Sequence, residues 1–179
     1  MTVSLIISTY NYSKALDIII DAIDRQTYLP DEIIIAEDGN DIETKEIVDS
    51  WRNKIASKFI HVNHADCGFR KALILNKAIR LSKSDYIIQI DGDCIPDKYF
   101  IKDHLFNAKP GCYLFGTRVH IKKEHISKFL LCSNNNEERL IDYSNIYSID
   151  RLSSSTVLEG GESITIGNEF KLFNNLDKS

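Results

Sequence analysis

The chain has 179 residues, a length typical of one domain, and 43% of them are hydrophobic, which is enough for a substantial core. Its formal net charge is −4, and no dense basic patch indicates a nucleic-acid partner. No stretch reaches the roughly 18–20 apolar residues of a membrane span, and the first residues lack the features of a signal peptide. The four cysteines form no C-x-x-C pair, which disfavours zinc. We therefore expect a cytoplasmic protein.

Short apolar runs alternate with amphipathic segments along the first two thirds of the chain. In chain order, the pattern predicts a strand over 3–8, a helix over 13–27, a strand over 32–36, a helix beginning at 41 or 44 and ending at 51, a strand over 59–62, a helix over 72–81, a strand over 86–90, a helix over 97–107 and a strand over 113–119. Ser13 is the expected N-cap of the first helix. In the helix over 72–81, Leu73, Leu75 (or Asn76) and Ile79 are expected to face the core.

This alternation predicts right-handed βαβ units, and so an α/β fold with a doubly wound, mostly parallel sheet flanked by helices. Beyond residue 122 the pattern weakens. A helix over 123–132 is expected either to cover the sheet or to touch a membrane surface, and its mixed charge favours the cover. Loops are expected around 153–155 and 159–162, and residues 174–179 are expected to fray.

Polar residues follow three of the predicted strands. Ligands of doubly wound sheets bind beyond the carboxyl ends of the strands, near the point where the strand order reverses. One crevice is therefore expected to collect three clusters: Thr9-Tyr10-Asn11, Glu37-Asp38 and Asp91-Gly92-Asp93.

Asp91 and Asp93 flank Gly92 at the end of an apolar strand. Two adjacent carboxylates repel each other, so a strand end that carries both is suited to a cation. An all-oxygen site favours Mg²⁺ or Mn²⁺, which is most useful when it also binds the phosphates of a nucleotide. The alternative is a solvated turn, because Asp and Gly are common turn residues.

A second cluster of charge opens the helix over 72–81. Arg70 and Lys71 stand where a helix N-terminus favours anions, so they are candidates for phosphate contact, and the alternative is a solvated first turn. Asp38 is a candidate acceptor for a base N–H, with a plain turn as its alternative.

The sequence lacks three motifs of other nucleotide-binding or hydrolytic enzymes: G-x-x-x-x-G-K-[ST], an early G-x-G-x-x-G and G-x-S-x-G. Their absence disfavours P-loop enzymes, dinucleotide oxidoreductases and α/β-hydrolases.

Over roughly residues 3–120, four ordered motifs resemble glycosyltransferase family 2, a family with the GT-A fold of nucleotide-diphospho-sugar transferases. They are Ile7-Ser8-Thr9-Tyr10-Asn11, Glu37-Asp38-Gly39, Asp66-x-Gly68-Phe69-Arg70-Lys71-Ala72 and Asp91-Gly92-Asp93. The stretch from Asp91 to Pro96, with Gly116-Thr117-Arg118-Val119, resembles a branch of bacterial polysaccharide glycosyltransferases whose C-terminal half is related to galactosyltransferases.

The resemblance implies inverting transfer from a UDP-sugar to a glycan or lipid-linked acceptor in surface polysaccharide synthesis, with Mn²⁺ or Mg²⁺ as cofactor and peripheral contact with the inner membrane surface. Residues 1–120 would form the donor-binding part of a single GT-A domain, and 121–179 a partial or truncated acceptor-side segment. Asp91 and Asp93 are the expected metal ligands. The expected nucleotide-binding residues are Thr9, Tyr10, Asn11, Glu37, Asp38, Asp66, Arg70, Lys71 and Asp91.

The sequence departs from the family in its last third. Glu159-Gly160-Gly161-Glu162 resembles the family's W-G-G-E-D-like motif but lacks the Trp and the second acid, so Glu162 is the candidate catalytic base and a flexible acidic loop is the alternative. A second hypothesis is therefore a nucleotide-sugar-binding remnant or subunit with weak or no catalysis. A third, a nucleotidyltransferase, is disfavoured because Thr9-Tyr10-Asn11-Tyr12 stands where such enzymes carry a glycine-rich basic loop.

Overall fold

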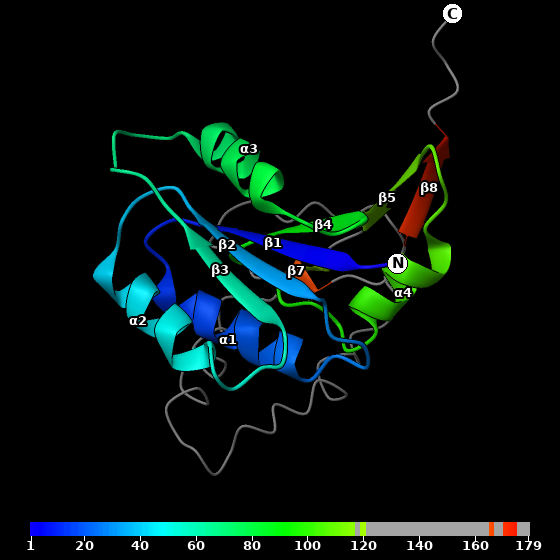
Figure 1. The fold of residues 1–179 in the computed structure, drawn as a ribbon, viewed down its shortest axis with the longest axis horizontal. Coiled ribbons are helices and arrows are strands. Elements are labelled where there is room, and N and C mark those ends of the chain that lie inside the picture. The colour runs from blue at the N-terminus through cyan, green and yellow to red at the C-terminus, as the bar shows by residue number, and fades with distance from the viewer. Residues whose placement is uncertain (117–118, 121–164, 167–169, 175–179) are drawn as a thin grey trace, which may run out of the picture.

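The centre of the fold is a four-stranded parallel sheet (Figure 1). The computed structural model describes residues 1–116, 119–120, 165–166 and 170–174. The strands lie in the order β3-β2-β1-β4, with the bounds β1 (Val3–Thr9), β2 (Glu32–Glu37), β3 (Lys58–Val62) and β4 (Tyr86–Asp91). The chain runs outward from β1 through β2 to β3 and then returns to the other side of β1, so the strand order reverses between β1 and β4. The doubly wound α/β fold predicted from the sequence is confirmed.

Helices cover both faces of this sheet, with α1 (Ser13–Asp24) and α2 (Ile42–Trp51) on one face and α3 (Lys71–Leu81) on the other (Figure 1). A shorter helix, α4 (Phe100–Asn107), follows β4. Successive side chains of a strand point to opposite faces, so each face of β1 has its own partners. Leu5 and Ile7 pack in the larger core cluster with α1 and α2, and Ile6 packs in the smaller cluster with α3.

The face that α3 turns toward the sheet differs from the predicted one. Ile74 and Ala78 are fully buried, whereas Leu73 is 46% exposed and Ile79 is 43% exposed. Leu75 is partly buried against the same cluster. Apolar residues occupy more than one side of this helix, so helical spacing alone allowed two orientations. Ile74 and Ala78 pack against Ile6 and Ile34 of the sheet, and this contact decides which side of the helix is buried.

The starts of α1 and α2 differ, because a side chain caps only the start of α2. Ser13 is not the N-cap of α1, because Tyr12 occupies that position and the Ser13 hydroxyl instead donates to Glu43 Oε2 at 2.8 Å, which links α1 to α2. At the start of α2, the Asp41 carboxylate caps the helix by accepting the Thr44 backbone N–H at 3.0 Å. This satisfies one of the N–H groups that a helix leaves without an internal partner.

The helix predicted from residue 97 begins later, at Phe100. Asp97 forms the turn before it: its carbonyl accepts the Phe100 N–H at 3.0 Å and its side chain accepts the Tyr99 N–H at 2.9 Å. Within the described residues, no helix is long and apolar enough to cross a membrane.

The predicted strand over 113–119 does not extend the parallel sheet. Its first part is β5 (Cys112–Gly116), which pairs antiparallel with β8 (Phe170–Asn174) in a separate two-stranded sheet. Its end lies in β6 (Val119–His120), which pairs antiparallel with β7 (Thr165–Ile166). The prediction of fraying is wrong for Asn174, because that residue pairs with Cys112. The predicted helix over 123–132, the loops around 153–155 and 159–162, and residues 175–179 lie outside the described residues.

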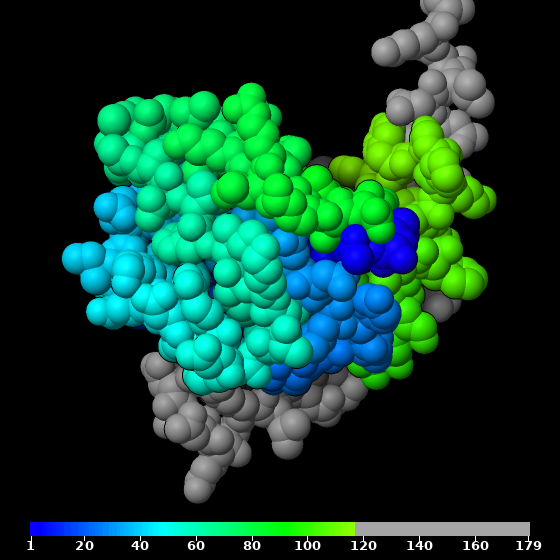
Figure 2. All heavy atoms as spheres, viewed as in Figure 1, coloured from blue at the N-terminus to red at the C-terminus, as the bar shows by residue number. Residues whose placement is uncertain are grey.

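The edge strand β4 carries side chains that the helices leave partly uncovered. Ile87, for example, is 38% exposed. Figure 2 shows the surface dipping between α3 and β5, where β4 lies.

Candidate functional site

A cavity of about 250 Å³ opens where β1 and β4 end, at the point of strand-order reversal. This is where ligands bind in doubly wound sheets. Its walls come from the ends of three strands and from the loop that leads into α3. The lining residues are Ser8, Thr9, Tyr10, Tyr12, Asp38, Phe69, Lys71, Asp91, Gly92 and Asp93.

The end of β1 supplies one wall of this cavity. Thr9 is 5% exposed, and its hydroxyl has no hydrogen-bond partner among the described residues. Tyr10 is 52% exposed and donates its hydroxyl to Asp66 Oδ2 at 3.0 Å; this bond and the charge of Asp66 raise the pKa of Tyr10. The chain then turns at Asn11, whose φ of 44° lies in the left-handed region that Asn tolerates better than most residues.

The end of β4 supplies the acidic wall. Ligand atoms of Asp91, Asp93 and Cys94 all lie within 4.8 Å of one another. Ser8 Oγ donates to Asp91 Oδ1 at 3.1 Å, and the Cys94 thiol contacts Asp93 Oδ1 at 3.4 Å. Two carboxylates in this arrangement suit Mg²⁺ or Mn²⁺, and Thr9, whose hydroxyl has no partner within the described part of the chain, lines the same cavity. The residues therefore fit a hard divalent cation. The sequence analysis did not single out Cys94, although its position next to Asp93 was a signal.

Lys71, the first residue of α3, brings positive charge to the same wall. Its ammonium forms an ion pair with Asp91 Oδ1, and both side chains are about one-third exposed. The Asp91 carboxylate thus already attracts one positive charge, the Lys71 ammonium. The ion pair also brings a residue of the predicted phosphate-contacting cluster next to a predicted metal ligand.

Asp38, beyond β2, forms the opposite side of the cavity and is 5% exposed. His64 Nε2 lies 2.6 Å from Asp38 Oδ1, and the Arg70 backbone N–H donates to Asp38 Oδ2 at 2.7 Å. Burial by itself would raise the pKa of Asp38, but these two hydrogen bonds and the nearby charges outweigh it and lower the pKa below its ordinary value. The sequence did not predict His64 at this site, because His64 lies 26 positions away from Asp38 and no local pattern links the two.

Other residues expected at the site do not line the cavity. Glu37 is fully buried, lies 2.7 Å from His61 Nε2 through its Oε2 atom, and accepts the Asp41 backbone N–H at 2.6 Å. Its hydrogen bonds therefore join β2 to β3 and to the start of α2. The Arg70 guanidinium donates to the Ala65 carbonyl, while its buried Nε has no hydrogen-bond partner among the described residues.

Asn11 and Asp66 also lie beside the cavity without lining it: Asn11 borders Gly39, and Asp66 accepts the Tyr10 hydroxyl. Glu162, the candidate base, and Glu159 lie outside the described residues.

Comparison with known proteins places this geometry in a family. The chain is 29% identical over 127 residues to chondroitin synthase of Pasteurella multocida, covering 69% of this chain and 13% of that protein. It is 26% identical over 175 residues to poly-β-1,6-N-acetyl-D-glucosamine synthase of Staphylococcus epidermidis, covering 96% of this chain and 39% of that protein. The chain thus spans well under half the length of both relatives.

A solved structure has the same fold. S. aureus TarS, residues 1–349, in complex with UDP-GlcNAc, superposes with a TM-score of 0.50 at 25% identity, covering 59% of this chain and 30% of that chain. The fold is GT-A. The family model for glycosyl transferase family 2 matches residues 4–149, which include the parallel sheet apart from Val3 and every residue that lines the cavity. The chain belongs to glycosyl transferase family 2.

Proposed function

We propose that the cavity binds a UDP-sugar and that this chain supplies the donor site of a metal-dependent, inverting glycosyltransferase. The observation that carries the proposal is the cavity at the strand-order reversal, because it unites Asp38 on one side with Asp91 and Asp93 on the other. A nucleotide diphosphate has both requirements, a base with N–H groups and a diphosphate that needs positive charge. The relatives named as polysaccharide synthases, and TarS with its bound UDP-GlcNAc, support this donor class.

Asp38 is the proposed acceptor for the uracil N3–H. Its depressed pKa keeps the carboxylate ionised at neutral pH. A hydrogen bond to a charged acceptor contributes about 1.5–3 kcal/mol, enough to favour a base that donates at this position. Thr9 and Tyr10 would lie beside the nucleoside, because they line the wall between Asp38 and the acidic cluster.

Asp91 and Asp93 are the proposed ligands of Mn²⁺ or Mg²⁺, and Asp91 is also the proposed acceptor for a ribose hydroxyl. When bound, the cation would stabilise the negative charge that develops on the diphosphate leaving group. Lys71 adds a second positive charge beside Asp91, and Arg70 opens α3, whose N-terminus favours an anion.

The acceptor side is proposed to come from residues 121–179, with residues 1–120 as the donor-binding part. In an inverting transfer, a base removes the proton of the acceptor hydroxyl as its oxygen attacks the anomeric carbon. The bond from that carbon to the diphosphate breaks on the opposite face, which inverts the configuration. Glu162 is the proposed base, and a glycan or lipid-linked acceptor of surface polysaccharide synthesis is the proposed partner. A lipid-linked acceptor would bring a cytoplasmic enzyme to the inner membrane surface.

Two measurements on the purified chain test this function. Titration calorimetry with UDP, in Mn²⁺ and in EDTA, should show binding that depends on the metal, and CDP, which differs only in the base, should bind more weakly. Product analysis with UDP-sugars and candidate acceptors should show transfer that Glu162→Gln abolishes while UDP affinity is retained. UDP binding that is equally strong in EDTA would contradict the metal role, and transfer unaffected by Glu162→Gln would remove Glu162 as the base.

A further inference from the structure

His64 contacts Asp38, which lines the cavity, although His64 does not line the cavity itself. His64 belongs to the loop that joins β3 to α3, and its side chain is 8% exposed. Its ring Nε2 is 2.6 Å from Asp38 Oδ1, and its backbone N–H donates to the Gly39 carbonyl at 3.3 Å. His64 therefore holds both the side chain and the backbone of the turn that carries Asp38.

The Asp38 carboxylate is held at both oxygens, by His64 at Oδ1 and by the Arg70 backbone N–H at Oδ2. The last torsion of an Asp side chain is broad, so a carboxylate held at one oxygen can still rotate. One held at both is fixed in a single plane. Each carboxylate oxygen can accept about two hydrogen bonds, so both oxygens keep capacity for a ligand on the cavity side.

We propose that His64 is a positioning residue for base recognition: by fixing the plane of the Asp38 carboxylate, it determines how strongly the site prefers uracil to cytosine. The proposal rests on the proposed function, in which Asp38 accepts the N3–H of the base. Uracil donates at N3 whereas cytosine accepts there, so a carboxylate held at that position attracts the first and repels the second. A carboxylate free to rotate turns away from cytosine and loses this discrimination.

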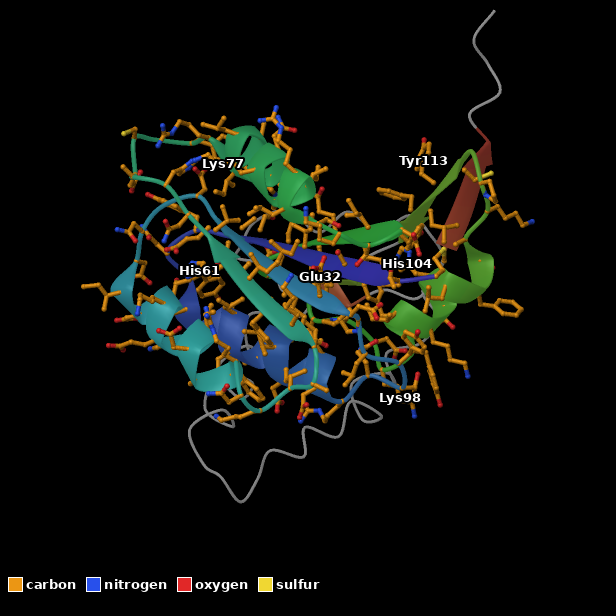
Figure 3. All side chains as sticks on the ribbon, viewed as in Figure 1. Glu32, His61, Lys77, Lys98, His104 and Tyr113 are labelled. Atoms are coloured by element: carbon orange, nitrogen blue, oxygen red, sulfur yellow. The ribbon has the colours of Figure 1, made fainter. Side chains whose placement is uncertain are left out.

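A second histidine on the same segment provides a matched control. His61 lies on β3 (Figure 3), its Nε2 is 2.7 Å from Glu37 Oε2, and its side chain is 9% exposed. The two histidine–carboxylate pairs thus have similar lengths and similar burial. They differ in the place of the carboxylate, because Glu37 is fully buried and does not line the cavity. Loss of either histidine removes a buried hydrogen bond, but only loss of His64 affects the cavity.

The experiment measures affinities for UDP, CDP and N3-methyl-UDP by titration calorimetry in Mn²⁺. In His64→Leu, which removes the donor, UDP should bind about tenfold more weakly. CDP should bind more tightly, because a carboxylate free to rotate turns away from N3 of cytosine, and N3-methyl-UDP, which donates nothing at N3, should lose no affinity. His64→Gln, whose amide N–H can reach the place of Nε2, should restore most of the UDP affinity. His61→Leu should lower the melting temperature and leave the ratio of UDP to CDP affinity unchanged.

A shorter amide keeps the test informative if His64→Leu fails to fold. His64→Asn has the same chemistry as His64→Gln but ends too early to reach Asp38, so it should lose UDP affinity where the Gln variant keeps it. Equal weakening of UDP and N3-methyl-UDP in the His64 variants would overturn the positioning role. So would equal UDP affinities of the Asn and Gln variants. The proposed function fails separately, if the wild-type chain binds UDP and N3-methyl-UDP equally or if Asp38→Asn leaves UDP affinity unchanged.

Discussion

Gly92 lies directly against Ser8 where β4 and β1 end. The Gly92 backbone N–H donates to the Ser8 carbonyl at 2.6 Å, and a Cβ atom on Gly92 would lie 2.7 Å from that same oxygen. It would also lie 3.0 Å from Thr9 Cβ. No side chain fits this space unless the strand ends separate. The absence of a side chain at Gly92 is what allows Asp91 and Asp93 to stand beside Thr9.

Gly92→Ala should therefore separate the acidic wall from the β1 wall. We expect a loss of about 1–3 kcal/mol in the free energy of unfolding, since a methyl group forced into a packed site is destabilising. Metal-dependent UDP binding should weaken at least about tenfold, since each 1.4 kcal/mol is tenfold in affinity. Urea unfolding and calorimetry measure the two effects. Gly116→Ala is the control, because a Cβ at Gly116 meets no atom of the described residues within 4 Å. Normal UDP binding by Gly92→Ala would show that the close approach is not required.

Asp93→Ala should remove the metal-dependent part of nucleotide binding and leave the fold intact, since Asp93 lines the cavity and takes no part in the core. With UDP at about 100 times its dissociation constant, the wild-type melting temperature should rise by roughly 5–10 °C in Mn²⁺. The rise should be much smaller in EDTA and in the variant. Asp49→Ala, an exposed carboxylate on α2, should behave like the wild type. A full Mn²⁺-dependent shift in Asp93→Ala would exclude Asp93 as a metal ligand.

Lys71→Met tests the ion pair with Asp91. The Lys71 ammonium competes with and repels a cation that binds Asp91, so removing that ammonium should strengthen Mn²⁺ binding to the nucleotide-free protein about three- to tenfold. Affinity for UDP in saturating Mn²⁺ should fall, because the proposed phosphate contact is lost. Electron paramagnetic resonance titration of free Mn²⁺ measures the first effect, and calorimetry the second. Lys77→Met is the control, because Lys77 lies on the same helix (Figure 3) but does not line the cavity. An unchanged or weaker affinity for Mn²⁺ in Lys71→Met would contradict the competition.

His104 on α4 should make folding stability depend on pH. Burial lowers the pKa of His104 (Figure 3) to about 4. The His104 ring accepts a hydrogen bond from the Tyr86 hydroxyl at 3.1 Å and packs edge-on against Phe100. Below a pH of about 6.5, the unfolded chain binds a proton that folded His104 does not take up until about pH 4. Stability should therefore be fully present above that range and fall by about 3 kcal/mol as the pH drops through it.

The measurement is urea unfolding of the wild type and His104→Gln at several values of pH between 4 and 7. The Gln variant has no titrating ring, so its stability should fall less steeply with falling pH. Taking the difference between the two proteins at each pH removes the titrations that they share. Parallel curves for the two proteins would show that His104 titrates alike in the folded and unfolded states.

The parallel sheet was predictable because its signals are local. The run Val3–Thr9 has an apolar centre and is buried throughout, as is typical of a strand covered on both faces, and the alternation with amphipathic helices sets the connections. The placement of Asp38, Asp91 and Asp93 at one edge followed from the same reasoning, because the carboxyl ends of parallel strands share an edge. Each of these inferences needs only the order of elements along the chain.

The features that the sequence left open depend on contacts between distant segments. Helical spacing allowed either side of α3 to be buried, and the choice of Ile74 and Ala78 was made by the surface of Ile6 and Ile34 that receives them. Similarly, no local pattern shows that Glu37 turns into the interior while its neighbour Asp38 enters the cavity.

By itself, then, the amino-acid sequence determined which segments of this protein become strands and helices and which carboxylates end the strands, because hydrophobic periodicity and turn chemistry act within a few residues. Only the tertiary structure decided which partners those carboxylates have. His64 reaches Asp38 across 26 positions of the chain, and Lys71 reaches Asp91 across 20. Such pairs form because the packed sheet brings their backbones together, and that spatial relationship leaves no periodic signal in the sequence.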